Sequence, residues 1–175
     1  SSAYDEVETD VAPFLESRGV PVLGVLPWER SMAGVTVADL TAELGAESLT
    51  GAPTDTLVER VLVGAMSGES ALSHFRRTKD AAVITGGDRA DVQAAALDAP
   101  GVNCLVLTGG HRPSGAILGE AEEQGMPVVT VQTDTLTTVE RIESMIHGGR
   151  VRDEATVGKM QELLHTHADV DALLD

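Results

Sequence analysis

Short apolar runs alternate with amphipathic patterns of helical period along most of this chain. The runs at residues 20–26, 58–66 and 127–131 are rich in valine, and Pro27 ends the first of them. Runs of this length and β-branched content predict strands, and a shorter strand is predicted at 48–51. The chain therefore carries a series of separate strands, each followed by a polar turn.

The centre of the chain repeats itself. The heptapeptide AAVITGG at 81–87 returns as CLVLTGG at 104–110, a spacing that fits one strand and one helix. Asp88 is expected to cap the helix after the first copy, and Ser114 the helix after the second. Two consecutive βα units are thus predicted at the middle of the domain.

The segments between the strands predict helices with recognisable ends. Thr36 is an expected N-cap, with Asp39 three residues on and Gly45 as the stop, and Ser67 is expected to cap a helix that turns Leu72 and Phe75 inward. A short helix is predicted with Pro13 in its first turn and Gly19 as its stop. Another is predicted to end at Gly148 and Gly149, with the apolar stripe Leu136, Val139, Ile142 and Ile146. A last helix is expected to start near Asp153 and to carry the apolar residues Val157, Met160, Leu164, Val170 and Leu173.

Strands that alternate with helices predict an α/β fold, a three-layer sandwich with a mostly parallel sheet built from repeated βα units. We expect residues 31–150 to form this domain. Residues 151–175 are expected to form a C-terminal helix that packs on the core or pairs with a second subunit. Residues 1–30, of which 1–10 are polar and aperiodic, end like a Rossmann-type layer without its beginning.

The chain is strongly acidic: 28 Asp and Glu stand against 12 Lys and Arg, a net charge of −16, and Lys79 and Lys159 are the lysines. Such a surface repels phosphate backbones and anionic lipid, which disfavours nucleic-acid and membrane partners. Dispersed acidic residues are also typical of adaptation to molar salt, where the Debye length falls to about 3 Å. We therefore expect a halophilic protein that low salt destabilises.

Cys104 is the single cysteine and lies in an apolar run, which predicts an inert core thiol without a disulfide partner. No stretch approaches the roughly 18 apolar residues that cross a bilayer, and the N-terminus lacks the apolar core of a signal peptide. These features predict a cytoplasmic protein. His165, His167 and Asp169 lie at a polar helix end, where surface histidines are commoner than metal ligands, so no metal site is expected.

The turns after three parallel strands are expected to meet at one edge of the sheet, which makes them the candidate ligand site. Glycine allows close backbone approach, and N–H groups at helix starts attract anions such as phosphate or carboxylate. The alternative is that the Gly-Gly pairs only make tight turns. The candidate ligand-binding residues are Thr85, Gly86, Gly87, Asp88, Arg89, Thr108, Gly109, Gly110, His111, Arg112, Thr133, Asp134 and Thr135.

No catalytic motif accompanies these turns. The chain has no P-loop, no G-x-G-x-x-G fingerprint, no H-E-x-x-H and no nucleophile elbow. We therefore expect a protein that is not an enzyme and has no catalytic residues. Met66, which follows Gly64 at a strand end, is interpreted as packing.

The residues Thr85-Gly-Gly-Asp88-Arg89 and Thr108-Gly-Gly resemble the DRTGG domain family, whose name spells these elements. The resemblance extends over about residues 20–147, through Pro27, Thr36-Val37, 63–66 and 133–135. In similar proteins the domain follows a dethiobiotin-synthetase-like P-loop domain in phosphotransacetylases, or stands beside CBS domains in regulated pyrophosphatases. The resemblance implies a regulatory, dimer-forming module, with residues 1–30 as the end of the P-loop domain; His111-Arg112 departs from the family pattern.

Three functions stay open at this point. The first is a regulatory homodimer that senses a small anionic metabolite or nucleotide and acts on a partner or attached acyl or acetyl transferase; its cofactor, if any, is unknown. The second is a structural homo-oligomerisation domain without a ligand. The third is phosphate acetyltransferase activity of the chain itself, which only the names of its relatives suggest.

Overall fold

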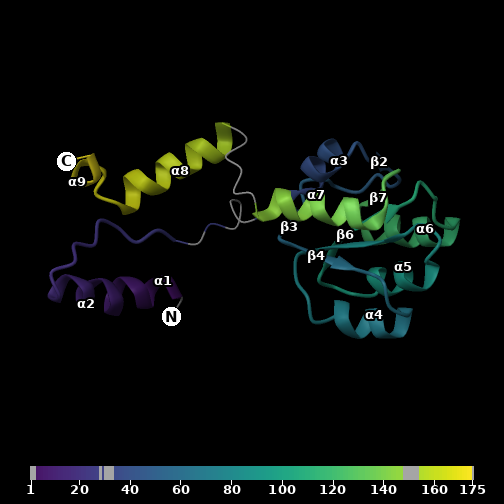
Figure 1. Cartoon of the computed structure of the whole chain (residues 1–175), viewed down its shortest axis with the longest axis horizontal. Helices are drawn as coiled ribbons and strands as arrows, with labels where there is room; N and C mark the ends of the chain where they lie inside the picture. Colours follow the sequence, from purple (N-terminus) through teal and green to yellow (C-terminus); the bar gives the residue numbers. More distant parts are fainter. Residues whose placement is uncertain (1–2, 28, 30–33, 148–153, 175) are drawn as a thin grey trace. The chain divides into compact units, whose positions relative to one another are not determined.

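The computed structural model describes residues 3–27, 29, 34–147 and 154–174. The chain divides into two compact units, residues 1–32 with 150–175, and residues 33–149 (Figure 1). The predicted helix ends at Gly148, Gly149 and Asp153 lie outside the described residues. Each unit is considered by itself.

The smaller unit is formed by helices from both ends of the chain. The N-terminal end supplies three consecutive helical segments, α1 (Ala3–Glu6), η1 (Val7–Val11) and α2 (Ala12–Ser17), followed by an extended stretch. The C-terminal end supplies α8 (Glu154–His167) and α9 (Val170–Leu174). The backbone N–H of Asp169 donates to the carbonyl of Leu23 at 2.6 Å. The Tyr4 hydroxyl lies 3.2 Å from Nδ1 of His167.

The predicted N-terminal helix is confirmed, whereas the strand after it is not. Pro13 lies in the first turn of α2 and Gly19 follows the end of this helix with a φ of +79°, although helical turns already begin at Ala3, in a segment expected to be aperiodic. The strand predicted at 20–26 was wrong: this run is an extended segment with one isolated bridge, between Gly24 and Ala168. Apolar content alone cannot make a strand, because a strand needs a neighbour to complete its ladder. Among the described residues this run has one bridge, at Gly24. Pro21 also removes one backbone donor from this run.

The larger unit is a five-stranded sheet between two layers of helices. The strand order is β2 (Glu47–Ser48), β7 (Val128–Thr130), β6 (Val102–Thr108), β5 (Ala81–Gly86) and β4 (Arg60–Val63). The pairs β4 with β5, β5 with β6 and β6 with β7 are parallel, and β2 joins β7 antiparallel at the edge. A separate antiparallel pair is formed by β1 (Val35–Thr36) and β3 (Leu57–Val58).

Each face of the sheet has its own core. On one face α4 (Gly68–Phe75), α5 (Ala90–Leu97) and α6 (Gly115–Gln124) bury Phe75, Val92 and Ile117 against Val83 and Leu107. On the other face α3 (Val37–Leu44) and α7 (Thr135–His147) bury residues such as Leu40 and Ile142 against Ile84, Val106 and Val129. The predicted α/β fold with a mostly parallel sheet is confirmed (Figure 1).

The helix ends agree with the sequence at two caps and differ at two others. Asp39 N–H donates to Thr36 Oγ1 at 3.1 Å and Thr36 N–H to the Asp39 carboxylate at 3.1 Å, a complete capping box, and Ser114 Oγ accepts from Ile117 N–H at 3.4 Å. Asp88 is not the cap of α5, because Arg89 occupies that position. Ser67 occupies the N-cap of α4, but its hydroxyl contacts Ser70.

Other local expectations shift by a few residues. The strand predicted at 58–66 divides into β3 and β4 and ends at Val63, and the one predicted at 48–51 is β2, which starts at Glu47. Leu136, the second residue of α7, was expected to face the core but is 68% exposed, whereas Val139 and Ile142 of the same stripe pack in the core.

Candidate functional site

Three of the predicted turns lie at the same edge of the sheet. Because β5, β6 and β7 are parallel neighbours, the turns that follow Gly86, Thr108 and Thr130 leave the sheet side by side. Backbone hydrogen bonds join them: the N–H of Gly87 donates to the Thr108 carbonyl at 3.3 Å, and that of Gly109 to the Thr133 carbonyl at 3.1 Å. The sequence-predicted residues of all three turns are therefore brought together.

Glycine is required at this edge because the turns approach one another closely. A Cβ on Gly87 would lie 2.2 Å from the His111 carbonyl oxygen, and one on Gly110 would lie 2.4 Å from the Gln132 amide oxygen. Gly109 and Gly110 also have φ values of +80° and +70°, in the left-handed region that side chains rarely adopt. The second turn therefore folds over the first.

Threonine hydroxyls cross-link the turns to one another and to the helices behind them. The Oγ1 atoms of Thr108 and Thr135 lie 2.9 Å apart, and those of Thr133 and Thr138 also 2.9 Å apart. Thr85 Oγ1 donates to the carbonyl of Gly64 at 3.2 Å, which attaches the turn after β4 to the group. The hydroxyl groups predicted as ligand contacts thus already hold the edge of the sheet together.

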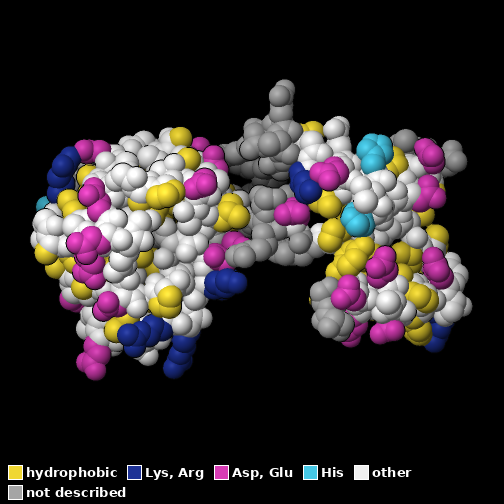
Figure 2. Space-filling model, turned by 180° about the vertical axis from the view of Figure 1, so that it is seen from behind, with side chains coloured by type: hydrophobic (Ala, Val, Ile, Leu, Met, Phe, Trp, Pro, Cys, Tyr) yellow, Lys and Arg dark blue, Asp and Glu magenta, His cyan; other side chains and the backbone are white. Residues whose placement is uncertain are grey.

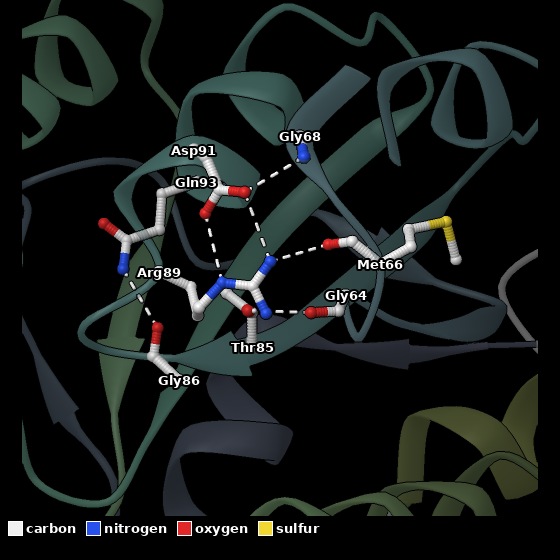
Figure 3. Close-up of polar contacts among 8 residues, drawn as sticks. All are labelled: Gly64, Met66, Gly68, Thr85, Gly86, Arg89, Asp91 and Gln93. Carbon is white, nitrogen blue, oxygen red and sulfur yellow. Dashed lines mark hydrogen bonds and ion pairs between the residues drawn. The ribbon is translucent and has the colours of Figure 1, made fainter. Parts of the chain in front are cut away.

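Arg89 is held by its own chain. Its guanidinium donates to the Asp91 carboxylate through Nε at 3.1 Å and Nη2 at 3.2 Å, and to the Met66 carbonyl at 2.6 Å. Asp91 also accepts from the N–H of Gly68, the first residue of α4, at 3.0 Å (Figure 3). We name these four residues the Arg89 clasp; it fastens the start of α4 to the start of α5.

The other predicted charged residues lie around the turns. Arg112 forms an ion pair with Glu47 of the edge strand β2, and both side chains are more than half exposed. Asp134 caps α7 by accepting from the N–H of Thr137 at 3.0 Å, and this contact lowers the pKa of the Asp134 carboxyl. His111 and Asp88 are exposed. The cations expected to attract an anion, Arg89 and Arg112, are thus both paired with acidic side chains.

One residue of this edge was missed from the sequence. Gln93 is fully buried on α5, and its Nε2 donates to the carbonyl of Gly86 at 3.0 Å (Figure 3). Its Oε1 finds no hydrogen-bond partner in the described part of the chain. A glutamine between Val92 and Ala95–Ala96, inside an otherwise apolar stripe, was the signal that could have identified it.

The opposite edge of the sheet holds a cavity of about 270 Å³, lined mainly by the turns that enter the strands. Its polar lining residues include Thr56 and Asn103, whose Nδ2 donates to the Leu57 carbonyl at 2.8 Å. This cavity lies away from the Thr-Gly-Gly turns.

Two other features are absent from the described residues. No three His, Cys, Asp or Glu side chains are grouped there to hold a metal ion, and none of the helices has the length and apolar character of a membrane span.

Acidic side chains are dispersed over the face that Figure 2 shows. Asp and Glu are spread over this face of each unit, with few Lys and Arg between them. Dispersed charge of one sign raises the energy of the folded state through self-repulsion, which salt screens.

A parallel α/β sheet that gathers glycine-rich turns at its carboxyl edge belongs to a class of folds that place ligands at this edge. The chain belongs to the DRTGG domain family, whose family model matches residues 39–145. The resemblance expected from the Asp-Arg and Thr-Gly-Gly elements is therefore confirmed.

Several curated proteins are similar to this chain. The phosphate acetyltransferase of Salmonella typhimurium is 28% identical over 98% of this chain and 25% of its own length, and that of Synechocystis sp. is 30% identical over 80% and 22%. The cobalt-dependent inorganic pyrophosphatase of Clostridium perfringens is 38% identical over 45% of this chain and 14% of its own length. The chain thus spans about a quarter or less of these relatives.

A solved structure has a similar fold. It is the regulatory region of Clostridium perfringens pyrophosphatase, containing CBS and DRTGG domains, in complex with its activator diadenosine tetraphosphate. The likeness has a TM-score of 0.56 at 24% identity and covers 82% of this chain and 73% of that one. At this identity the likeness supports the fold alone.

The Arg89 clasp makes a pH-dependent contribution to stability. The hydrogen bond from Arg89 lowers the pKa of the Asp91 carboxyl below its usual 3.8 and raises the pKa of Arg89. A depressed carboxyl pKa stabilises the fold above the pKa of the unfolded chain, and this contribution is lost as pH falls through the folded-state value.

We therefore expect Asp91→Asn to destabilise the protein at neutral pH, and the difference from wild type to shrink as the pH falls below about 3.8. Urea unfolding of both proteins between about pH 6 and about pH 2.5 measures this. A difference that is independent of pH would show that the charge of Asp91 does not contribute to the clasp.

Cys104 is expected to be unreactive while the protein is folded. It is fully buried in the core between the sheet and helices α3 and α7, and burial raises the pKa of its thiol to about 12. Since the thiolate is the nucleophile, alkylation by iodoacetamide at about pH 8 should be very slow in the native protein and fast in denaturant. Rapid labelling without denaturant would contradict the burial of β6.

Proposed function

We propose that this chain is a regulatory DRTGG domain that binds a small anionic metabolite or nucleotide at its Thr-Gly-Gly edge. The observation that carries the proposal is the meeting of three glycine- and threonine-rich turns at the carboxyl edge of a parallel sheet. A complex of CBS and DRTGG domains with diadenosine tetraphosphate supports a nucleotide as the ligand class. The residues proposed to line the site are those predicted from the sequence.

The ion pairs of Arg89 and Arg112 suggest how ligand binding changes the structure. An anion that enters this edge competes with Glu47 for Arg112 and with Asp91 for Arg89. The exposed pair of Arg112 with Glu47 exchanges at low free-energy cost, whereas Arg89 also has to give up its hydrogen bond to the Met66 carbonyl. A ligand that binds more tightly to the state in which these ion pairs are broken shifts the population of the domain toward that state. Regulation by a ligand requires such a difference in affinity between two states.

The regulated activity is proposed to reside in a partner or an attached domain. The similar phosphate acetyltransferases are about four times as long as this chain, so an acyl or acetyl transferase is the natural partner class. We propose that the chain works as a homodimer in the cytoplasm of a salt-adapted organism, with residues 1–30 as the end of a P-loop domain. An assay with acetyl phosphate and coenzyme A is expected to detect no turnover by this chain.

Thermal unfolding in the presence of acetyl-CoA, acetyl phosphate, adenine nucleotides, nicotinamide dinucleotides and cyclic dinucleotides tests the proposal, at low salt and in molar KCl. A ligand at 100 times its dissociation constant adds about 2.7 kcal/mol to the free energy of unfolding. Arg112→Ala is expected to weaken the shift, while Arg77→Ala, an exposed arginine just after α4, should leave it unchanged.

If no compound shifts the transition while its midpoint rises with protein concentration, the domain acts as an oligomerisation unit instead. An equal loss of the shift in Arg112→Ala and Arg77→Ala would mean that each substitution acts by making the net charge more negative, which strengthens the general repulsion of the anion, and not at the turns.

A further inference from the structure

Gln93 stands out among the buried residues of the larger unit. Its polar amide side chain lies in the layer between the sheet and helices α4, α5 and α6. Its neighbours on the helix, Val92 and Ala96, are apolar and fully buried. Its Nε2 is satisfied by the Gly86 carbonyl at 3.0 Å, but its Oε1 has less than 1 Å² of exposed surface and accepts from no donor in the described residues. A buried acceptor without a partner is costly, so its presence in this chain needs a physical explanation.

The Gly86 carbonyl determines which way the amide faces. If the Gln93 amide were rotated by half a turn, its oxygen would lie against the Gly86 carbonyl oxygen, two acceptors in contact. The Oε1 atom is bonded to the same carbon as Nε2, so it lies next to the last residue of β5, where the first turn begins. Figure 3 shows this oxygen directed away from the Arg89 clasp.

A second unpartnered polar atom lies on the same face of the sheet. Thr130 is the last residue of β7 and only 4% exposed, and its Oγ1 lacks a partner within the described chain. Side chains alternate along a strand, and Val128 packs in the core beneath α4, α5 and α6, so Thr130 faces that layer too. In the sheet register Leu107 pairs with both Thr130 and Thr85. Two unsatisfied polar groups therefore flank the end of β6, from which the second Thr-Gly-Gly turn departs.

We propose that Gln93 is the residue that selects the neutral part of the ligand, by accepting a hydrogen bond from one of its N–H or O–H groups. This rests on the proposed function: the turns take the anionic group, and Gln93 presents a fixed acceptor beside them. An ionised phosphate offers no donor to it, whereas a nucleoside phosphate offers the amino group of its base and the hydroxyls of its ribose. The site thereby favours nucleoside phosphates over simple anions.

Access to Gln93 passes the second turn. A Cβ on Gly87 would lie 2.2 Å from the His111 carbonyl oxygen, so the backbone of the second turn lies directly against the first turn, which begins beside Gln93. This segment is tied down by the exposed ion pair of Arg112 with Glu47. The ligand must displace the segment to reach Oε1, and the hydrogen bond that it then makes favours the displaced state.

The test compares ATP with three probes. 2′-deoxy-ATP lacks the 2′-hydroxyl of the ribose, the triphosphate of purine riboside lacks the amino group of the base, and inorganic triphosphate lacks the nucleoside. Dissociation constants are measured by calorimetry for wild type, Gln93→Met and the control Gln124→Met, a change at an exposed glutamine of α6 on the opposite edge of the sheet. We expect wild type to bind ATP about tenfold more tightly than one of the two nucleotide analogues. Gln93→Met should abolish that preference and keep the affinity for inorganic triphosphate, and Gln124→Met should behave as wild type.

The outcomes separate this inference from the function on which it rests. If wild type binds inorganic triphosphate as tightly as ATP, or if Gln93→Met keeps the wild-type preference, the inference is overturned and an anion-sensing function stands. If wild type binds none of the probes and nothing in the wider ligand series, the proposed function itself fails. Gln93→Leu, which has neither a donor nor an acceptor in its side chain, serves as a second variant if Gln93→Met does not fold; it too must lose the preference, because leucine offers no acceptor to the ligand.

Discussion

Replacing Phe75 with alanine is expected to lower the free energy of unfolding by about 3–5 kcal/mol. Phe75 is the last residue of α4 and the largest of the fully buried side chains. It belongs to the core that also contains Ala71, Val83 and Val92, so its removal leaves a cavity that small aliphatic neighbours cannot fill. Urea unfolding, followed by circular dichroism at a salt concentration where the wild type is folded, measures the loss.

The chain offers a matched control in its other phenylalanine. Phe14 is 55% exposed on α2, where its ring lies 5.0 Å beneath the guanidinium of Arg18. An exposed contact of this kind contributes about 0.5–1 kcal/mol, so Phe14→Ala should have a small effect. If the two substitutions were equally destabilising, α4 would not be packed against the sheet as described.

The larger unit was predictable because its sequence signals are local and consistent. The repeat at 81–87 and 104–110 specifies two strands of the parallel sheet, and Thr36 with Asp39 specifies the start of α3 through contacts only three residues apart. Parallel strands joined by helices then place the turns at one edge without further information. The position of the candidate site followed from topology.

The errors arose where the structure depends on partners distant in sequence. Residues 20–26 have the composition of a strand, but in the part of the chain that the structure describes their only ladder contact is the bridge of Gly24 to Ala168. Asp88 looked like the cap of α5, yet the backbone turns once more and α5 starts after Arg89. Composition gives the propensity of a segment, whereas tertiary contacts decide whether it is realised.

The chemistry of the site was the least predictable part for the same reason. Arg89 was expected to be available for an anion, but it bonds to Met66, 23 residues earlier, and Arg112 pairs with Glu47, 65 residues earlier. Neither partner is visible in a pattern of hydrophobic and polar positions. Gln93 was hidden because a single glutamine barely alters the amphipathic pattern of α5.

Substituting Gly87 with alanine is expected to lower the free energy of unfolding by about 1–3 kcal/mol and to change the second turn. The new Cβ would lie 2.2 Å from the His111 carbonyl oxygen and 2.7 Å from the His111 Cβ, distances that real Cβ contacts do not reach. The carbonyl oxygen belongs to the backbone and the Cβ is fixed to it, so neither can rotate away and the backbone around His111 has to move. Urea unfolding measures the loss of stability, and hydrogen exchange of the Gly109 and Gly110 amides reports on the turn, because both donate to backbone carbonyls.

Gly119→Ala is the matched control for this substitution. Gly119 lies inside α6 with no heavy atom within 4 Å of an added Cβ, so alanine there should stabilise the protein by about 0.5–1 kcal/mol. If Gly87→Ala proved as benign as Gly119→Ala, with unchanged exchange at Gly109 and Gly110, the second turn would not rest on the first. Ligand entry beside Gln93 would then need no displacement of the 109–112 segment. Faster hydrogen exchange at Gly109 and Gly110 in a Gly87→Ala protein that still folds would show the opposite, that this segment opens independently of the sheet beneath it.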